Sequence, residues 1–362
     1  MRAVVRDRIA HTPRRISADK QPSPPRQLFD RSDRRVGISS DPTSGGPDGA
    51  DRAADAGGTT STDDAGGSAP ADPADDPSRL VTRRRLLYGV AGGVGLVGGG
   101  GLYVANALSG DFGGYEAPET QPMVSTRGRL DDAEPTARSG SWEFGGADAV
   151  VLYVHGLGAD AESARDQAYA ARLGLEAASE APGGASALPV VGYSWSSNVD
   201  WGPAKRTADD NAAPLADWLT AWADEDGRPV HLFAHSLGAR VTGATLRELA
   251  DRGRTDVLAS ASLFGGAVPR DSVGTERAYG AAVEALDAPV YNFHSRSDRV
   301  LGWVYRASDR TRAVGHGGIS AAATAPDGYA DVDVTDLIAD HYSYLEPDAG
   351  CLSRAVDRIE FE

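Results

Sequence analysis

A serine in the stretch Pro229–Arg240 (PVHLFAHSLGAR) is placed where it could act as a nucleophile. The residues Pro229–Ala234 have strand-forming types, and those after Gly238 have the apolar spacing of a helix. Ser236 would therefore lie on a tight strand-to-helix turn, with Ala234 and Gly238 as small residues two positions to either side. Such a turn strains the backbone of the serine and exposes its hydroxyl, which is the geometry of a nucleophile elbow.

The chain around this turn alternates short apolar runs with longer amphipathic stretches. This alternation predicts an α/β fold with a largely parallel sheet and covering helices. Strands are expected at Ala149–Val154, Pro189–Tyr193, Pro229–Ala234, Val257–Phe264, Pro289–His294 and roughly Ala330–Val334. Helices are expected at Ala161–Glu180, Asp209–Ala223, Ala239–Arg252, Thr275–Leu286 and Cys351–Phe361.

From about Ser141 to its end the chain resembles the α/β-hydrolase superfamily of esterase-like and lipase-like serine hydrolases. The likeness rests on the AHSLG elbow and on the HGLG loop that follows an apolar strand at His155–Gly158. The stretches VVGYSWSSNVDWGPAKRTADDNAAPLADWL and YNFHSRSDRVL also resemble a widespread group of serine hydrolases. The resemblance implies an α/β-hydrolase fold, with a mostly parallel central sheet, helices on both faces and a small cap or none.

The superfamily order of nucleophile, acid and histidine assigns two partners to the serine. The acid is expected after the strand PVYNFH, where Asp298 follows, and the base before the closing helix, where His341 lies. Asp298 would hold the imidazole of His341, and His341 would take the proton of Ser236. The alternatives that stay open are Asp287 or Asp309 as the acid and His316 as the base.

The resemblance also assigns an oxyanion hole, which requires two backbone N–H donors. Leu237, directly after the nucleophile, is expected to supply one donor, and Leu157 in the HGLG loop the other. His155 and Gly156 would shape that loop. Aromatic residues that could line the pocket, or equally pack in the core, are Tyr193, Trp195 and Trp201.

This set of residues predicts a serine hydrolase that cleaves small-molecule carboxylic esters or other acyl substrates through an acyl-enzyme. No cofactor or metal is expected, since the sequence shows no metal-binding cluster. The site should be fairly open, because only Gly265–Ala288 separates two strands after the elbow. The alternative that stays open is a loop at Arg296–Asp327 that covers the pocket. Two alternatives stay open: a binding protein that kept the fold without turnover, and a thioesterase, peptidase or acyltransferase.

The chain is strongly acidic, with 36 Lys and Arg residues against 52 Asp and Glu residues and a formal net charge of −16. From Leu108 onward 21 basic residues stand against 39 acidic ones, which disfavours nucleic acid as a partner. Lys20 and Lys205 are the only lysines, a pattern typical of salt-adapted, haloarchaeal-type proteins. A GC-rich genome would explain the scarcity of lysine but not the excess of acid. The single cysteine, Cys351, excludes an intramolecular disulfide and is expected to pack in the core.

The part before the folded domain divides into three segments. Residues 1–80 read as a disordered leader, which would not be translated if the protein starts at Val81. Residues 81–107 contain the arginines and uncharged run of a twin-arginine-like signal or a membrane anchor. Residues 108–140 read as a polar linker, and residues 141–362 as the α/β-hydrolase domain.

Two locations follow from the segment 81–107. Ala105-Asn106-Ala107 has the small-x-small pattern of a cleavage site, so export through a twin-arginine-like route would release a chain beginning at Leu108. Without cleavage, residues 86–107 would associate with the membrane and leave the domain facing outside.

Overall fold

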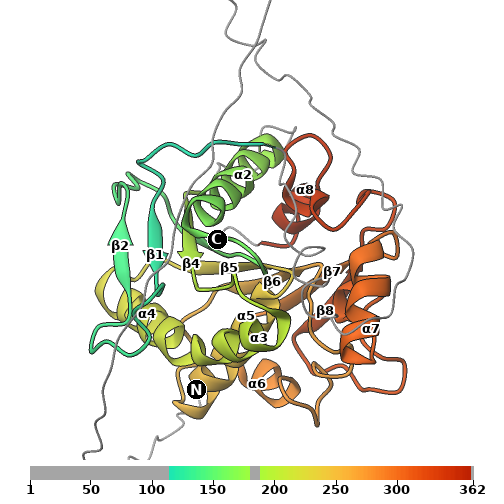
Figure 1. Ribbon diagram of the computed structural model, residues 1–362. Coiled ribbons are helices and arrows are strands. Elements are labelled where there is room, and N and C mark those ends of the chain that lie inside the picture. The colour runs from blue at the N-terminus through green and yellow to red at the C-terminus, as the bar shows by residue number, and fades with distance from the viewer. Residues whose placement is uncertain (1–113, 180–187, 360–362) are drawn as a thin grey trace, which may run out of the picture. The chain divides into compact units, whose positions relative to one another are not determined.

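An eight-stranded sheet lies at the centre of the computed structural model, which describes residues 114–179 and 188–359 (Figure 1). The strand order is β2-β1-β4-β3-β5-β6-β7-β8. β1 and β2 pair antiparallel, and the other neighbouring strands pair parallel, as the sequence predicted. The strands are β1 (Met123–Ser125), β2 (Ala137–Ser139), β3 (Val150–Val154), β4 (Val190–Ser194), β5 (Val230–His235), β6 (Ser260–Phe264), β7 (Val290–His294) and β8 (Tyr329–Asp333).

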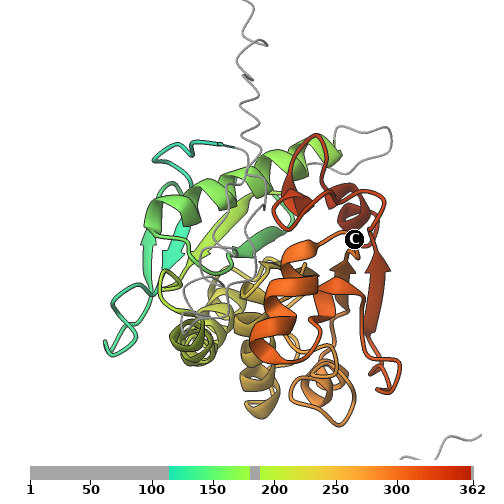
Figure 2. The ribbon, with the colours of Figure 1, turned by 45° about the vertical axis from the view of Figure 1, so that its right-hand side comes forward.

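Helices cover both faces of this sheet (Figures 1 and 2). One face carries α2 (Ala161–Ser179) and α8 (Leu352–Val356). The other carries α3 (Trp201–Asp210), α4 (Ala212–Glu225), α5 (Gly238–Asp251) and α6 (Gly280–Ala285). The connections after β6 contain the π-helix η1 (Val300–Tyr305), α7 (Arg306–Asp309), and the 3₁₀ turns η2 (Val314–His316) and η3 (Ser343–Leu345).

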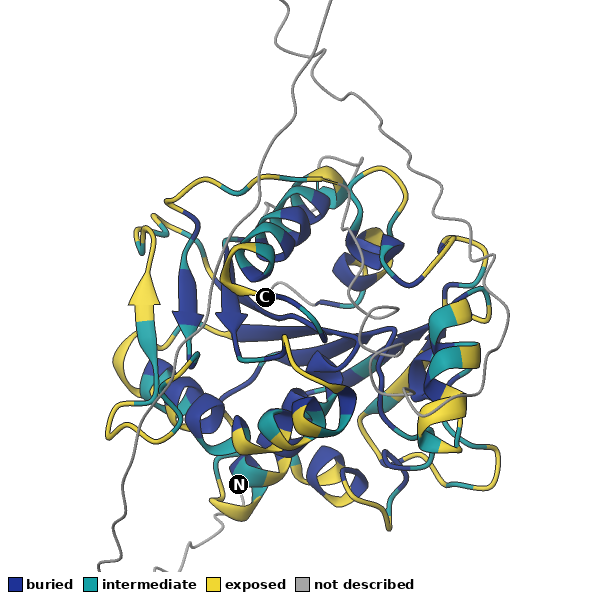
Figure 3. Cartoon of the chain, in the orientation of Figure 1, coloured by how far each residue is buried: buried dark blue, intermediate teal, exposed yellow. Residues whose placement is uncertain are grey.

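The central strands β3 to β6 are buried on both sides, which explains why they read as continuous apolar runs (Figure 3). In β3, Val150, Leu152 and Val154 pack with α3, α4 and α5, whereas Val151 and Tyr153 pack with α2 and α8. This alternation follows from the two-residue period of a strand. Two apolar layers therefore fix the sheet, and with it the loops at the carboxyl ends of its strands.

The predicted elements differ from the observed ones mainly at their ends. β6 begins at Ser260 rather than Val257, although Val257 itself is buried. The helix expected at Thr275–Leu286 is only α6, because Gly280 lies so close to the carbonyl of Gly274 that the chain turns there instead. The last helix is likewise limited to α8.

The polar linker assigned to residues 108–140 requires correction, because its described part contributes β1 and β2 to the sheet. Three-residue strands are too short to show a periodicity in sequence. β1 is held by pairing with β4 and by burial of Met123 and Val124, and β2 pairs with β1. The domain therefore includes sheet residues well before Ser141.

A helix was also missed, since the prediction began at Asp209 whereas α3 begins at Trp201. Pro203 lies in the first turn of this helix, where proline is tolerated. Buried Asn211 separates α3 from α4 and accepts hydrogen bonds from Thr126 (2.6 Å) and Tyr193 (2.9 Å).

The segments 1–80 and 81–107 lie outside the described residues. Within residues 114–179 and 188–359, no helix has the length and apolarity that crossing a membrane requires.

Candidate active site

Ser236 occupies the turn between β5 and α5 in a left-handed conformation, with φ of 53°. A residue with a Cβ adopts this region only at a cost in energy, so the strain expected for a nucleophile elbow is present. Neighbouring backbone holds the turn in place. The amide of Ser236 donates to the carbonyl of Phe264 (3.0 Å), and its carbonyl accepts from the amides of Ala239 (3.1 Å) and Ala267 (2.9 Å).

Two glycines let other backbone approach the serine closely. A Cβ on Gly156 would lie 2.8 Å from the Cβ and 3.3 Å from Oγ of Ser236. A Cβ on Gly238 would collide with the carbonyl of Val154 and lie 2.8 Å from that of His155. Gly238, the small residue two positions after Ser236, is therefore required because the end of the neighbouring strand β3 lies so close to it.

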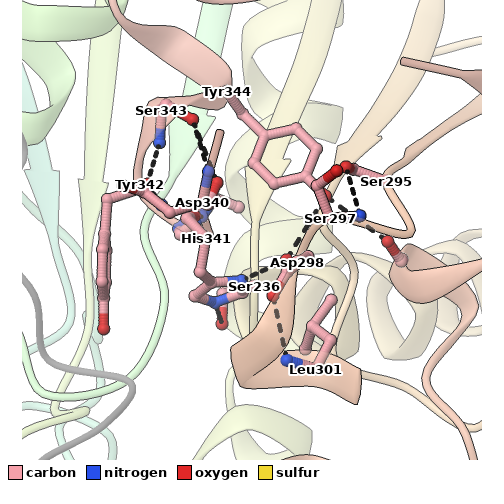
Figure 4. A network of polar contacts seen from close by, with 12 residues as sticks. Ser236, Ser295, Ser297, Asp298, Leu301, Asp340, His341, Tyr342, Ser343 and Tyr344 are labelled. Carbon is pink, nitrogen blue, oxygen red and sulfur yellow. Dashed lines mark hydrogen bonds and ion pairs between the residues drawn. The ribbon is translucent and has the colours of Figure 1, made fainter. Parts of the chain in front are cut away.

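The structure brings together the three predicted catalytic residues (Figure 4). Oγ of Ser236 lies 2.9 Å from Nε2 of His341, and Nδ1 of His341 lies 2.6 Å from Oδ2 of Asp298. The carboxylate requires a proton on Nδ1, so Nε2 is free to accept the hydroxyl proton of the serine. The arrangement is that of a nucleophile, a general base and an orienting acid.

Both oxygens of Asp298 are engaged. Oδ1 accepts the amide of Leu301 (2.9 Å), while Oδ2 accepts from His341 and from the hydroxyl of Tyr344 (3.3 Å). Burial and the charge of Asp298 raise the pKa of Tyr344 well above its ordinary value, so its hydroxyl stays protonated. These donors keep the carboxylate oriented toward His341.

The backbone of His341 is held from the elbow itself. Nε2 of His235 donates to the carbonyl of His341 (2.8 Å), and the two rings lie 4.8 Å apart. Burial and the proximity of His341 lower the pKa of His235 well below its usual range. His235 is therefore a neutral donor that fixes the loop bearing the base. Asp340 completes this loop by accepting the amides of Tyr342 (2.9 Å) and Ser343 (3.1 Å).

His155 fixes the second loop beside the serine. The amide of Trp195 donates to Nε2 of His155 (3.1 Å), which places the proton on Nδ1, and Nδ1 lies 2.8 Å from the carbonyl oxygen of Gly156. In a trans peptide the N–H points opposite to the C=O. The Gly156 carbonyl therefore faces the His155 ring, and the amide of Leu157 faces the other way.

Arg127 supports His155 and was missed by the sequence analysis. Its Nη2 lies 3.3 Å from Nε2 of His155 and donates to the carbonyl of Ala159 (2.8 Å), and its Nε donates to Oγ of Ser194 (2.6 Å). Burial, together with this guanidinium, lowers the pKa of His155 to about 3. Arg127 follows β1 in the segment interpreted as a linker, where no local pattern distinguishes it from a surface arginine.

The structure is consistent with the backbone amides of Leu157 and Leu237 as the two expected oxyanion donors. Among the described residues, no acceptor binds the amide of Leu157 or that of Leu237. The neighbouring amides of Gly158 and Ala159 are occupied by Ser197, at 3.0 Å and 3.2 Å. The amides of Gly158 and Ala159 are thus engaged, whereas that of Leu157 has no partner among the described residues.

The residues that the sequence left open as an alternative acid or base make other contacts. His316 packs against Gly302 of η1, and Asp287 accepts the hydroxyl of Thr255 (3.0 Å). Asp309 accepts Nε1 of Trp201 and Nζ of Lys205, each at 2.6 Å.

The aromatic residues considered for the pocket have packing positions. Trp195 is fully buried, stacks on His155 with ring centroids 5.5 Å apart, and donates to its carbonyl (2.9 Å). Trp201 is 4 % exposed and packs edge-on against Tyr305. Tyr193 is fully buried and bonded to Asn211. Cys351 is also buried, as expected.

The site is less open than the short connections suggested. The side chains of Ser236, Asp298 and His341 each have 0 % exposure. Gly156 lies directly against the serine, and Tyr342 lies edge-on to His341 with ring centroids 5.5 Å apart. No group of His, Cys, Asp and Glu residues suited to a metal ion occurs in the part of the chain that the structure describes.

The strand order, the strained serine turn and the order of Ser236, Asp298 and His341 along the chain define an α/β-hydrolase fold. A family model described as "Protein of unknown function (DUF726)" matches residues 183–355, which include all three of these residues.

The chain is also similar to curated proteins whose names describe them as membrane or transmembrane proteins. It is 30% identical over 137 residues to "Uncharacterized membrane protein C6F6.13c" of Schizosaccharomyces pombe, covering 36% of this chain and 16% of that protein. It is 36% identical over 145 residues to "Transmembrane and coiled-coil domain-containing protein STS1" of Oryza sativa subsp. japonica, covering 40% of this chain and 21% of that protein. The matches thus span about a fifth or less of each relative's length.

Solved structures with similar chains include a Pyrobaculum calidifontis esterase and the Bacillus licheniformis lipase BlEst2. The esterase has a TM-score of 0.34 and 17% identity, and the match covers 59% of this chain and 76% of that one. The lipase has a TM-score of 0.35 and 15% identity, with 60% and 94% covered. The fold assignment rests on the chain's own topology and elbow.

Proposed function

We propose that the protein is a serine hydrolase that cleaves carboxylic esters through an acyl-enzyme. The observation that carries this proposal is the hydrogen-bonded series from Ser236 through His341 to Asp298, with distances of 2.9 Å and 2.6 Å. A serine hydroxyl is a weak nucleophile at neutral pH unless a base is positioned to accept its proton. His341 is so positioned, and Asp298 holds it in the required tautomer.

The reaction then follows from the geometry. Oγ of Ser236 attacks the ester carbonyl as Nε2 of His341 takes its proton, and the protonated imidazole passes that proton to the leaving alkoxide. The resulting acyl-enzyme is hydrolysed when His341 deprotonates a water. Both tetrahedral intermediates carry an oxyanion, for which the amides of Leu157 and Leu237 are the proposed donors.

His155 and Arg127 are positioning residues in this mechanism. Nδ1–H of His155 holds the carbonyl of Gly156, so the Leu157 amide is oriented before substrate binds. Arg127 donates toward Nε2, which keeps the proton of His155 on Nδ1. Preorganised donors stabilise the transition state more effectively than donors that must rotate during the reaction.

The same machinery can serve thioesters, amides or acyl transfer, and these remain the enzymatic alternatives. A binding protein without turnover is the non-enzymatic alternative. The connected triad and the strained serine favour catalysis over binding alone, because strain at a nucleophile has a cost that packing does not require.

We also propose that the domain works at or beyond a membrane. The segment 81–107 combines arginines with an uncharged run, and the similar curated proteins are named as membrane proteins. Arg83→Lys with Arg84→Lys should retain the protein inside cells if the export route is of the twin-arginine kind. If this variant is found in the same cell fractions as the wild type, the twin-arginine route is contradicted. The segment 81–107 would then be interpreted as a membrane anchor.

The function is tested with the full chain on p-nitrophenyl esters from acetate to palmitate, in low and high salt because the surface is acidic. Ser236→Ala should lower kcat by about 10³ or more and abolish fluorophosphonate labelling. Alanine also carries a Cβ, so the turn keeps its shape. Ser353→Ala, at an exposed serine of α8, should leave both ester hydrolysis and fluorophosphonate labelling unchanged.

The outcome that would overturn esterase activity is a folded wild type that is neither labelled nor active on any ester. Labelling without ester turnover, followed by activity on thioesters or amides, would move the proposal to those substrates. A melting temperature that is the same for wild type and Ser236→Ala confirms that the comparison is between folded proteins.

A further inference from the structure

The segment 296–312, which begins beside the catalytic acid, differs in charge from the rest of the domain. It contains five arginines and two aspartates, whereas residues 108–362 carry 21 basic and 39 acidic residues. The two aspartates do not offset the arginines at the surface. Asp298 is buried against His341, and Asp309 is bound to Trp201 and Lys205.

One outward side of this segment carries arginines around a tryptophan. Trp303 of η1 is 78 % exposed, against 42 % for Val199 and 41 % for Leu337, the other exposed large apolar residues in the described part of the chain. Four exposed residues of this stretch are spaced three to four positions apart, whereas Leu301 and Tyr305 between them are buried. We call this outward side the Arg–Trp face, which consists of Arg299, Trp303, Arg306 and Arg310.

The helical stretch of η1 followed by α7 lies at the right-hand side in Figure 1 and comes to the front in Figure 2. Within the described residues, Arg299, Arg306 and Arg310 form no ion pair with a carboxylate. By contrast, Arg252 and Arg254 are each paired with two carboxylates. The face is therefore a local patch of free positive charge on an acidic domain.

We propose that the Arg–Trp face docks on an anionic lipid bilayer. Tryptophan is favoured at the membrane–water interface, and arginines near an anionic leaflet are attracted to its headgroups. The acidic remainder of the domain does not prevent this, because charges more than about 8 Å away are largely screened at physiological salt. Arginine and tryptophan are also enriched in protein–protein interfaces, so a protein partner is the competing outcome of the test. The uncharged segment that precedes the domain in the chain is what favours lipid.

The position of the domain in the chain favours the same partner. The sequence carries no charged residue from Leu86 to Gly110, and the described domain begins at Gly114. Four residues reach at most about 14 Å. If the segment 86–110 meets a membrane, the domain that follows lies close to the lipid surface.

The face also has a direct structural link to the candidate site. The amide of Leu301, a buried residue of η1, donates to Oδ1 of Asp298 (2.9 Å). One side of this helical stretch therefore binds the proposed catalytic acid, and the other side carries the Arg–Trp face. Docking would bring the carboxyl edge of the sheet near lipid, which makes esters dissolved in the bilayer the substrate class. This last consequence rests on the proposed function, whereas the docking does not.

The docking is tested on the full chain with an environment-sensitive fluorophore on Ala307→Cys, an exposed position of α7. The native thiol of Cys351 is buried, so the label attaches to the introduced cysteine. Vesicles of phosphatidylcholine alone are compared with vesicles that also contain phosphatidylglycerol. The probe should shift to a less polar environment on the anionic vesicles, while the same probe on Ser353→Cys of α8 should not.

Charge and ring are tested separately. Arg299→Gln, Arg306→Gln and Arg310→Gln together should weaken the anionic-vesicle response about a hundredfold in lipid concentration. The matched control removes three exposed arginines elsewhere, Arg206→Gln, Arg277→Gln and Arg354→Gln, and should retain the response. Trp303→Ser should reduce the probe shift even where binding persists.

Three results would overturn the proposal: equal responses on neutral and anionic vesicles, equal loss in the two triple variants, or a response to heparin without one to vesicles. The segment 86–110 is common to every variant, so vesicle association alone is not the readout. The experiment is repeated in Ser236→Ala, whose docking should be unchanged. A failed hydrolase assay and a failed docking assay are therefore distinguishable.

Discussion

The guanidinium of Arg127 lies 3.3 Å from Nε2 of His155, and through that ring it acts on the peptide bond between Gly156 and Leu157. The ring holds the carbonyl of Gly156 at 2.8 Å, and the Leu157 amide is thereby turned away from the ring. An arginine from the edge of the sheet thus takes part in orienting a proposed oxyanion donor.

Replacement of Arg127 by alanine should lower kcat for ester hydrolysis by about tenfold to a hundredfold with a smaller effect on KM. The reason is that a mispositioned donor loses part of the roughly 10²–10³ that an oxyanion donor contributes. Steady-state kinetics on a short ester measures both constants. Arg129→Ala is the control, since Arg129 is a half-buried neighbour whose guanidinium contacts Asp132 and the carbonyl of Glu134. Equal effects of the two variants would contradict the assigned role.

His155→Gln should have an effect on kcat similar to that of Arg127→Ala, and the double variant should be little worse than either. Residues that act through one another are not additive. A double-mutant cycle in kcat measures this coupling. Strict additivity would show that Arg127 and His155 act on separate features of the site.

Gly238→Ala should destabilise the protein by about 1–3 kcal/mol, because the added methyl collides with the carbonyl of Val154. Gly202→Ala in α3 is the matched control, since the nearest atom to its Cβ would be Nη1 of Arg206 at 3.9 Å. This control should be neutral or stabilising by about 0.5–1 kcal/mol. Urea unfolding of both variants measures the two differences, and a stable Gly238→Ala protein would contradict the close approach.

The free energy of unfolding should fall as the pH falls from about 6.5 toward 4. Burial lowers the pKa of His231 from 6.5 to about 4, and burial with Arg127 lowers that of His155 to about 3. Those of His235 and His294 are also lowered. In this window the unfolded chain binds protons that the folded chain excludes, so unfolding is favoured as the pH drops.

Each of these histidines contributes up to about 1.4 kcal/mol per pH unit inside its window. The measurement is urea unfolding at several pH values for wild type and for His231→Gln, which lies on β5 outside the site. The variant should show a shallower dependence by about one proton. An unchanged slope would show that His231 titrates alike in the folded and unfolded states.

The elbow was predictable because its determinants are local. A strand, a serine between small residues and a following helix are contiguous in sequence, and the observed φ of 53° at Ser236 agrees with that pattern. Asp298 and His341 were found from the superfamily's order along the chain, and the structure brings them into one hydrogen-bonded series.

Arg127 was not predictable in this way, because its function depends on strand register. It reaches His155 only because β1 pairs beside β4, with Ser125 opposite Ser194. Nothing within the polar segment 108–140 indicates that pairing. The reason for Gly238 was also only partly predicted, since the backbone that requires it belongs to β3, more than eighty residues earlier in the chain.

The position of β1 between β2 and β4 has a consequence for how the domain can be cut. A fragment starting at Ser141 would keep every residue of the triad, the HGLG loop and the AHSLG elbow. It would nevertheless leave the N–H and C=O groups of β4 unpaired along one side, a template on which other fragments could add strands and precipitate. A fragment that is to stay in solution must therefore begin before β1, a three-residue strand that precedes both the HGLG loop and the AHSLG elbow.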